Sequence, residues 1–388
     1  MKPETLAIRD QIDRTAYREH STPLFMTSSF VYHSAEHAEL MFSGSEEGDI
    51  YSRFTNPNTT ELINKYCSLE KAEAGVCTAS GMSAIFTTLS ALLGQGDEVV
   101  ACEGLFGNTN YILKNVLPKW GIKTTFVSLK EPIDWESAIT SQTKLVFIET
   151  PTNPGLNILD VEEIGRICKK NDAIFCVDNC FATPFLQQPI LMGADLCLHS
   201  ATKWIDGQGR TLGGIIVGKQ NYVDIIFDFL RRTGACLSPF NAWLLSKSTE
   251  TLAIRMEKHC SNALKLAQFL QNHDFVDSVK YPFLESHPQY GTAKRQMRYG
   301  GGIVTFSVKG NKEKTFEFIN RLKIPTITAN LGDSRTIVTH PSTTTHRKLT
   351  SEEKQAVGIS DSTIRTSVGL ESIDDIILDF DQALKTVG

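Results

Sequence analysis

Several features that mark particular classes of protein are missing from this sequence. No apolar run in its 388 residues approaches the roughly 20 residues that a membrane-spanning helix needs. Residues 1–18 are polar and charged and lack the apolar core of an export signal. With 39 basic and 44 acidic residues the formal charge is −5, which disfavours nucleic acid or an anionic membrane as a partner. We therefore expect a cytoplasmic protein that acts on small molecules.

Two sequence motifs are also absent. The nine cysteines form no CxxC pair, and Cys77, Cys176 and Cys197 lie within apolar segments. We expect small buried side chains in a reducing compartment and no metal site. No GxGxxG follows the first predicted strand with an acid about 20 residues further on. This absence disfavours a dinucleotide-dependent oxidoreductase, the alternative that an α/β pattern alone permits.

The middle of the chain alternates apolar strands with amphipathic helices. Strands are predicted at residues 75–78, 98–102, 123–127, 145–149, 174–178, 195–198 and 214–217, and helices at 81–93, 109–117, 161–170 and 222–232. This alternation predicts an α/β fold whose mostly parallel sheet is covered on both faces.

Three regions are predicted along the chain. Residues 1–54 have weak periodicity and form an N-terminal arm, residues 55–246 form the α/β domain, and residues 247–388 form a smaller α+β domain. In the last region we expect a long helix at 249–272, strands at 300–308 and 336–339, and helices at 312–322 and 373–386.

An acid and a lysine follow two of the predicted strands. Asp178 ends one strand, and Ser200, Thr202 and Lys203 follow the next, at the carboxyl ends where open α/β sheets bind ligands. Pyridoxal 5'-phosphate (PLP) needs an amine for its aldehyde, an acid for its ring nitrogen, and hydroxyls and amides for its phosphate. Alone, a strand-terminal acid is more often a turn residue and such a lysine is more often exposed. Their order on successive strands favours the cofactor.

A second anion site is predicted at the Ser80-Gly81-Met82 turn, which opens the helix 81–93. Gly81 lets the backbone approach a phosphate, and its amide and that of Met82 would point toward it. An ordinary capped helix start explains the same residues equally well.

Over essentially its whole length the chain resembles the Cys/Met metabolism, or trans-sulfuration, family of PLP-dependent enzymes. The resemblance implies the aspartate-aminotransferase-like fold (fold type I) and a homotetramer built as a dimer of dimers. It is carried by ordered motifs: Tyr51-Ser52-Arg53, Ser80-Gly81-Met82, Pro151-Thr152-Asn153-Pro154, Val177-Asp178-Asn179, His199-Ser200-Ala201-Thr202-Lys203, Leu331-Gly332-Asp333, His340-Pro341 and Ile364-Arg365.

The resemblance also implies roles at the cofactor. Lys203 would bind it covalently and move protons, Asp178 would pair with the ring nitrogen, and Asn153 would hydrogen-bond the phenolic oxygen. Four residues would hold the phosphate, namely Gly81, Met82, Ser200 and Thr202.

Other implied roles concern the neighbouring subunit and the substrate. Tyr51 and Arg53 would reach the phosphate of a partner subunit, and Tyr51 could also contact substrate and supply a proton. Arg365 would bind the substrate α-carboxylate, and Asn330 would also contact the substrate. Without the resemblance, Tyr51 and Arg53 are typical of a surface loop, and Arg365 of a structural ion pair. We expect structural roles for His340 and His346.

Phe106 narrows the substrate class. Most members of the family carry a ring-stacking tyrosine where this chain has Phe106, which can stack but has no phenol. A thiol leaving group, with a pKa of about 8.5, benefits from a nearby acid, whereas a carboxylate of pKa about 4 leaves without a proton. Phe106 therefore favours an O-acylhomoserine over cystathionine or methionine.

One branch of the family shows the greatest resemblance, the O-succinylhomoserine sulfhydrylases. The resemblance lies at residues 177–181, 203–210, 237–243, 330–333 and 340–346. It implies that sulfide replaces the succinyl group of O-succinylhomoserine to give homocysteine for methionine biosynthesis. Cystathionine γ-synthase, O-acetylhomoserine sulfhydrylase and cystathionine or methionine γ-lyase remain alternatives.

Overall fold

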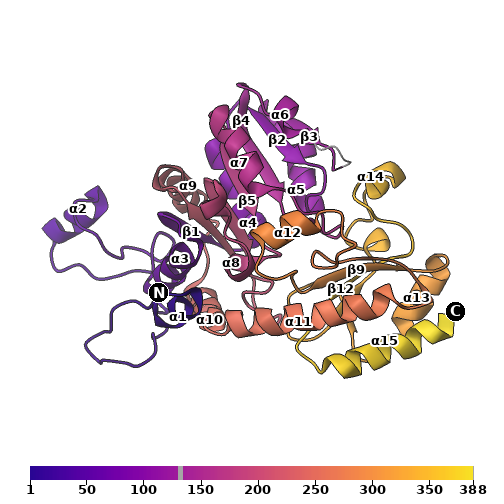
Figure 1. The fold of residues 1–388 in the computed structure, drawn as a ribbon. Helices are drawn as coiled ribbons and strands as arrows, with labels where there is room; N and C mark the ends of the chain where they lie inside the picture. Colours follow the sequence, from indigo (N-terminus) through magenta and orange to yellow (C-terminus); the bar gives the residue numbers. More distant parts are fainter. Residues whose placement is uncertain (130–133, 388) are drawn as a thin grey trace.

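The computed structural model describes residues 1–129 and 134–387, which form an N-terminal arm and two sheet-containing lobes (Figure 1). The helices of the arm and large lobe are α1 (Pro3–Arg9), α2 (Ala35–Ser43), α3 (Pro57–Glu70), α4 (Gly81–Leu92), α5 (Gly107–Tyr111), η1 (Ile112–Val116), η2 (Leu117–Trp120), α6 (Trp135–Ala138), α7 (Val161–Lys170), α8 (Thr183–Leu186), η3 (Pro189–Met192), α9 (Gln220–Thr233) and α10 (Pro239–Thr249).

The large lobe contains a sheet of seven strands in the order β1-β7-β6-β5-β4-β2-β3. They are β1 (Ala74–Thr78), β2 (Glu98–Cys102), β3 (Lys123–Val127), β4 (Thr143–Glu149), β5 (Ile174–Asp178), β6 (Leu196–Ser200) and β7 (Gly214–Gly218). Only β7 runs antiparallel to its neighbours. The mostly parallel α/β sheet is thus confirmed, with strand ends within two residues of those predicted.

Burial explains why these strands could be predicted from their apolar residues. All five residues of β5 and of β7 are buried, because helices pack on both faces of the sheet. The connecting helices begin at recognisable caps. Ser80 accepts a hydrogen bond from the Ser83 amide at the start of α4 (3.1 Å), and Asp160 accepts one from the Glu163 amide at the start of α7 (3.1 Å).

The second lobe is built on a five-stranded sheet in the order β10-β11-β12-β9-β8. Its elements are α11 (Leu252–Gln271), β8 (Val276–Lys280), α12 (Tyr290–Gln296), β9 (Ile303–Val308), α13 (Lys312–Arg321), β10 (Thr326–Ile327), β11 (Ile337–Thr339), η4 (Pro341–Thr343), α14 (Ser351–Ala356), β12 (Thr363–Ser367) and α15 (Ile373–Val387).

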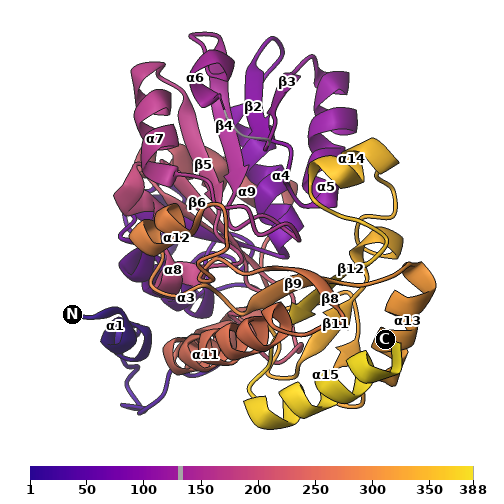
Figure 2. The ribbon, with the colours of Figure 1, turned by 45° about the vertical axis from the view of Figure 1, so that its right-hand side comes forward.

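Helix α11 joins the two lobes (Figures 1 and 2). Its first half contributes Leu252 and Met256 to a core shared with the large lobe, and its second half contributes Leu266 and Leu270 to the core of the second sheet. The predicted helix at 249–272 corresponds to α11, which begins three residues later than predicted because the backbone at Thr251 leaves the helical region and separates α11 from α10. The proposed domain boundary after residue 246 falls inside α10.

Several elements of the second lobe were not predicted from the sequence. Strand β12 has the sequence Thr-Ile-Arg-Thr-Ser, yet all five residues are buried. Its polar side chains hide the apolar pattern of a strand because they serve hydrogen bonds and a pocket rather than the core. The helices α12 and α14 and the strand β8 are short or half-exposed and give weak periodicity.

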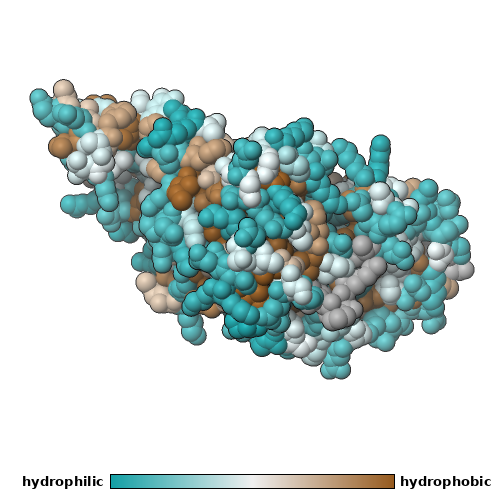
Figure 3. Space-filling view, turned by 90° about the horizontal axis from the view of Figure 1, so that it is seen from above, coloured by the Kyte–Doolittle hydropathy of each residue, from teal (hydrophilic) through white to brown (hydrophobic). Residues whose placement is uncertain are grey.

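The N-terminal arm projects from the body and has solvent-exposed apolar side chains. Helix α2 lies at its tip, at the left of Figure 1, and the same projection shows hydrophobic patches at the left of Figure 3. Val31 is 95% exposed and Phe42 is 66% exposed in the single chain. Among the described residues there is no helix that is both long and apolar enough to cross a bilayer.

Candidate active site

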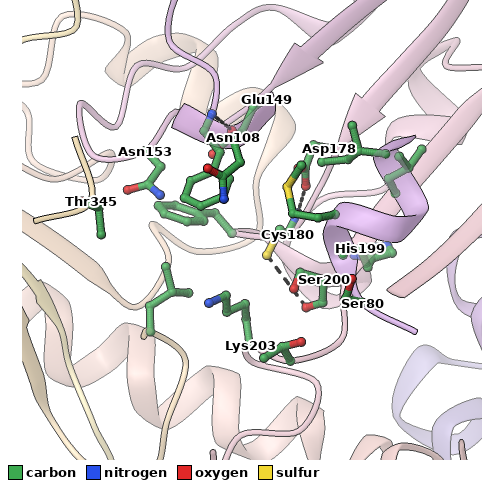
Figure 4. Close-up of a pocket in the computed structure, with 18 of the residues that line it drawn as sticks. Ser80, Asn108, Glu149, Asn153, Asp178, Cys180, His199, Ser200, Lys203 and Thr345 are labelled. Atoms are coloured by element: carbon green, nitrogen blue, oxygen red, sulfur yellow. Dashed lines mark hydrogen bonds between the residues drawn. The ribbon is translucent and has the colours of Figure 1, made fainter. Parts of the chain in front are cut away.

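A cavity of about 420 Å³ opens at the carboxyl ends of β4, β5 and β6. Both lobes line it, since the large lobe supplies most of the wall and residues of the second lobe close one side. Lys203, Asp178 and Asn153 point into this pocket (Figure 4). The predicted residues that line it are Gly81, Met82, Phe106, Asn153, Asp178, Ser200, Thr202, Lys203 and Arg365.

Two buried carboxylates lie side by side at the base of the cavity. Glu149 and Asp178 end β4 and β5 and are partners in the register of the two strands. Burial raises the pKa of Asp178 to about 6, although the Cys180 amide donates a hydrogen bond to it at 3.0 Å. Burial and the neighbouring Asp178 raise the pKa of Glu149 well above its usual range. A cation beside Asp178, such as a protonated ring nitrogen, would relieve this cost.

Lys203 follows β6 and is positioned by the second lobe. Its Nζ donates a hydrogen bond to the Asn330 side-chain oxygen at 2.7 Å. Burial, reinforced by the nearby Arg365, lowers the pKa of Lys203. A lysine with a lowered pKa is more often neutral, which is the form that attacks an aldehyde and accepts a proton.

The start of α4 forms one end of the cavity and has the donors that a phosphate needs. Ser80 caps the Ser83 amide, whereas the amides of Gly81 and Met82 make no hydrogen bond within the described chain. A Cβ at Gly81 would lie 2.5 Å from the Cβ of Ser200, so only glycine permits this approach. Free amides at a helix N-terminus beside hydroxyl groups fit the phosphate of PLP.

Arg365 lies on β12 at the opposite end and is 2% exposed. It donates to the Asn153 side-chain oxygen and to the Asn330 carbonyl, each at 3.0 Å. Burial lowers its pKa to about 10, so the guanidinium remains charged at neutral pH. Its buried Nε has no hydrogen-bond partner among the described residues. An unsatisfied buried donor on a cation fits a carboxylate ligand.

Phe106 lies in the wall of the pocket. Its backbone amide donates to the Glu149 carboxylate at 2.8 Å. The lining residues that were not predicted as site residues include Glu149, Asn108, Cys180 and Thr345. The sequence signal for Glu149 existed, because it ends a predicted apolar strand in the same way as Asp178.

Tyr51 and Arg53 do not lie at this cavity within one chain. Tyr51 is 40% exposed at the base of the arm, and the Arg53 guanidinium lies over the rings of Tyr51 and Phe54 at 5.4 and 4.8 Å. Arg53 also donates a hydrogen bond to the Arg231 carbonyl. Their predicted position at a neighbouring subunit's phosphate remains a prediction.

A buried polar cluster lies behind the cavity. Glu70 Oε1 is 2.7 Å from His199 Nε2 and accepts hydrogen bonds from Asn179 Nδ2 at 3.0 Å and from Cys197 Sγ at 3.4 Å. Glu70, Cys197 and His199 could also be arranged as ligands of a metal. Because all three contacts converge on one carboxylate oxygen, hydrogen bonding alone explains the cluster.

The match to a known family agrees with this geometry. A family model for Cys/Met metabolism PLP-dependent enzymes matches residues 4–385. The chain belongs to this family. Its members use PLP, so the protein is a PLP-dependent enzyme of the trans-sulfuration class, and the predicted cofactor and the fold type I architecture are confirmed.

Named relatives within the family have more than one activity. The chain is 42% identical to an O-succinylhomoserine sulfhydrylase of Pseudomonas aeruginosa, over 98% of this chain and 94% of that protein. It is 40% identical to an L-methionine gamma-lyase of Fusobacterium nucleatum, over 99% and 98% of the two chains.

A solved structure extends the comparison to the fold and cofactor. A protein from Campylobacter jejuni assigned as an O-acetylhomoserine (thiol)-lyase superimposes with a TM-score of 0.95 at 33% identity, over 99% of this chain and 100% of the other. That structure carries a pyridoxyl-lysine phosphate, as expected of a family whose lysine binds the cofactor.

Proposed function

We propose that this family member is an O-succinylhomoserine sulfhydrylase, which replaces the succinyl group of its substrate with sulfide and forms homocysteine for methionine biosynthesis. The observation that carries the proposal is the pocket wall around Phe106. Within one chain, no tyrosine occurs among the described residues that line the cavity, and any phenol would have to come from Tyr51 of a neighbouring subunit. Succinate leaves as a stable anion and needs no acid, whereas a thiol leaves more readily with one. The sulfhydrylase relative at 42% identity supports the same reaction.

The proposed roles follow from the positions of the side chains. When bound, PLP withdraws electrons from the substrate and makes its Cα and Cβ protons acidic. We assign Lys203 as the residue that binds the cofactor and moves these protons, since its amine is buried with a lowered pKa. Asn330 holds the Lys203 amine by its side chain at 2.7 Å, which keeps the base near a fixed position.

The remaining groups bind and orient. Asp178 would remain ionised beside the ring nitrogen. The side-chain oxygen of Asn153 accepts a hydrogen bond from Arg365, whereas its side-chain nitrogen makes no hydrogen bond to the described residues and can donate to the phenolic oxygen. Gly81, Met82, Ser200 and Thr202 would hold the phosphate, and Phe106 would stack on the ring. Arg365 would take the substrate α-carboxylate on its unsatisfied Nε.

The proposal includes a homotetramer built as a dimer of dimers, in which Tyr51 and Arg53 complete the site of a neighbour. The exposed apolar side chains of the projecting arm support contact with another copy. Mixed subunits test it. A Lys203→Ala variant and an Arg53→Ala variant should each be inactive, and refolding them together should restore activity. Unrestored activity would show that each site is complete within one chain.

A cytoplasmic location is part of the proposal, and nine free cysteines support it.

A matrix of substrates tests the reaction itself. Purified holoenzyme would receive O-succinyl- or O-acetylhomoserine with sulfide or cysteine, and homocysteine and cystathionine would be measured. We expect homocysteine from the succinyl donor with sulfide. Cystathionine as the dominant product would identify a cystathionine γ-synthase. Methionine converted to 2-oxobutanoate at a comparable rate would identify the γ-lyase activity named for the Fusobacterium relative.

A further inference from the structure

A second cavity of about 520 Å³ adjoins the active-site cavity and has no assigned role. The two cavities share Asn108 and Thr345 in their walls, so they lie on either side of these two residues. This second cavity is the outer cavity, and the active-site cavity is the inner one. On one side, the outer cavity is lined by the segment that follows Phe106, including Tyr111 and Lys114. On the other side it is lined by residues 344–349 and Glu353 of the second lobe.

The outer cavity has an excess of positive charge. Lys114 Nζ is 2.7 Å from the Glu353 carboxylate, so these two lining charges neutralise each other. Burial lowers the pKa of His346 to about 4, which leaves this imidazole uncharged at neutral pH. Lys348 also lines the cavity, and it forms no ion pair with a carboxylate among the residues that the structure describes. Its ammonium group is therefore the unbalanced charge of this space.

The backbone of the large-lobe wall is unusual as well. Helix α5 continues into η1, a π-helical turn over Ile112–Val116 that directly follows Tyr111. Such turns are rare in proteins and occur frequently at functional sites. The turn places Lys114 against Glu353 of α14, and Figure 2 shows α14 beside α5. This contact joins the two lobes along the cavity and engages the Glu353 carboxylate, so that Glu353 does not neutralise Lys348.

We propose that the outer cavity binds the acyl chain of the donor and that Lys348 binds its terminal carboxylate. This proposal rests on the proposed function and names the acyl group that the site selects, a dicarboxylic monoester. Beyond the ester oxygen a succinyl chain spans four bonds, about 5 Å, and ends in a carboxylate, whereas an acetyl group ends after about 2.5 Å in a methyl group. Only the longer chain presents a charge to Lys348.

This arrangement would place the two carboxylates of the substrate in different cavities. Arg365 would bind the α-carboxylate in the inner cavity, beside Asn153 and Asn330. Lys348 would bind the acyl carboxylate in the outer cavity, on the far side of Asn108 and Thr345. The ester bond would then lie between the two cavities, close to the pocket wall that contains Phe106.

Charge-removing variants with matched controls test the proposal. Lys348→Met keeps the length of the side chain and removes its charge. Arg347→Met removes a neighbouring exposed charge that lines none of the described cavities, and Lys119→Met does so on the large lobe. We expect Lys348→Met to raise KM for O-succinylhomoserine three- to tenfold with little change in kcat, and to leave KM for O-acetylhomoserine unchanged. Equal effects on both donors, or an equal effect of Arg347→Met, would overturn the assignment.

A binding experiment separates this proposal from the proposed reaction. Succinate and acetate would be titrated into the holoenzyme at one ionic strength, with no amino-acid substrate present. We expect succinate to bind at least threefold more tightly than acetate, and this preference to disappear in Lys348→Met but not in Lys119→Met. No preference in the wild-type enzyme would overturn the outer site even if homocysteine is formed. A preference that depends on Lys348 would support the site even if the acceptor is cysteine and not sulfide.

Discussion

The backbone amide of Phe106 donates a hydrogen bond to the buried Glu149 carboxylate at 2.8 Å. Glu149 itself ends β4 next to Asp178 on β5, so one side chain links the residue expected to stack on the cofactor ring to the acid expected at the cofactor nitrogen. Strand register fixes Glu149, and the hydrogen bond transmits that position to the loop that carries Phe106. The aromatic wall of the pocket is therefore set by the sheet and not by the loop alone.

Removing this link should weaken cofactor binding. We expect Glu149→Ala to raise the dissociation constant of PLP about tenfold, because a hydrogen bond to a charged or buried group is worth about 1.5 kcal/mol or more. Glu149→Gln also removes the acid but keeps an acceptor for the Phe106 amide, and it should bind PLP more tightly than the alanine variant. Absorbance titration of the apoprotein measures both. Equal dissociation constants for the two variants would show that the hydrogen bond does not position the ring.

The buried carboxyl group of Asp178 should lower the stability of the apoprotein and strengthen the binding of PLP. Burial raises its folded-state pKa to about 6, above the value of about 3.9 expected in the unfolded chain. The folded apoprotein therefore holds an extra proton between these values, and its stability falls as pH rises from about 4 to 6. The gap corresponds to at most about 3 kcal/mol.

Asp178→Asn removes this cost and also removes the proposed partner of the ring nitrogen. We expect the variant apoprotein to be more stable than wild type at pH 8, by up to about 3 kcal/mol, with a smaller difference at pH 5. Its affinity for PLP should fall. Urea unfolding of both apoproteins at the two pH values measures the first effect. A stability difference that does not change with pH would mean that Asp178 is not the titrating group.

Much of this site could be predicted from the sequence, and the reason is its position at strand ends. Asp178 ends a strand that is buried on both faces, and Lys203 closely follows another, so the strands and the polar residues at their ends can be recognised in the sequence. Glu149 follows the same rule and was missed only because no motif drew attention to it.

Less of the second lobe could be predicted from the sequence. Arg365 lies in a strand whose alternating pattern is hidden by buried polar side chains, and Asn330 meets Lys203 only after the two lobes have packed together. Contacts between residues 127 positions apart are fixed by tertiary structure and have no local signature. The outer cavity has the same origin, since Lys348 and Tyr111 come from different lobes.

Lys203 should be the lysine that carries the cofactor. We expect borohydride reduction of the wild-type holoenzyme to fix PLP permanently to a peptide containing Lys203, detected by mass spectrometry. Lys203→Ala should bind PLP reversibly and lose it on dialysis after the same treatment. Label on another lysine of the variant would assign the covalent role elsewhere.

Arg365 should act on the substrate more than on the cofactor. Replacement with lysine keeps a cation but loses the planar donor pair and the hydrogen bond to Asn153 or Asn330. We expect Arg365→Lys to raise KM for the amino-acid substrate 10- to 100-fold, equivalent to about 1.4 to 2.8 kcal/mol. The PLP dissociation constant should change less than threefold. A larger loss of PLP affinity than of substrate affinity would favour the structural role of Arg365.

The Glu70 cluster allows a test of hydrogen bonding against metal binding. Glu70→Ala would remove the acceptor shared by His199, Asn179 and Cys197 in a fully buried site. Because unsatisfied buried donors each cost about 1 to 3 kcal/mol, we expect the free energy of unfolding to fall by about 3 kcal/mol or more. Glu70→Gln keeps an acceptor and should lose less than half as much. Thermal unfolding with and without a chelator completes the test, since a chelator should leave Tm unchanged if hydrogen bonds hold the cluster. A Tm lowered by the chelator in wild type but not in Glu70→Ala would instead identify a bound metal.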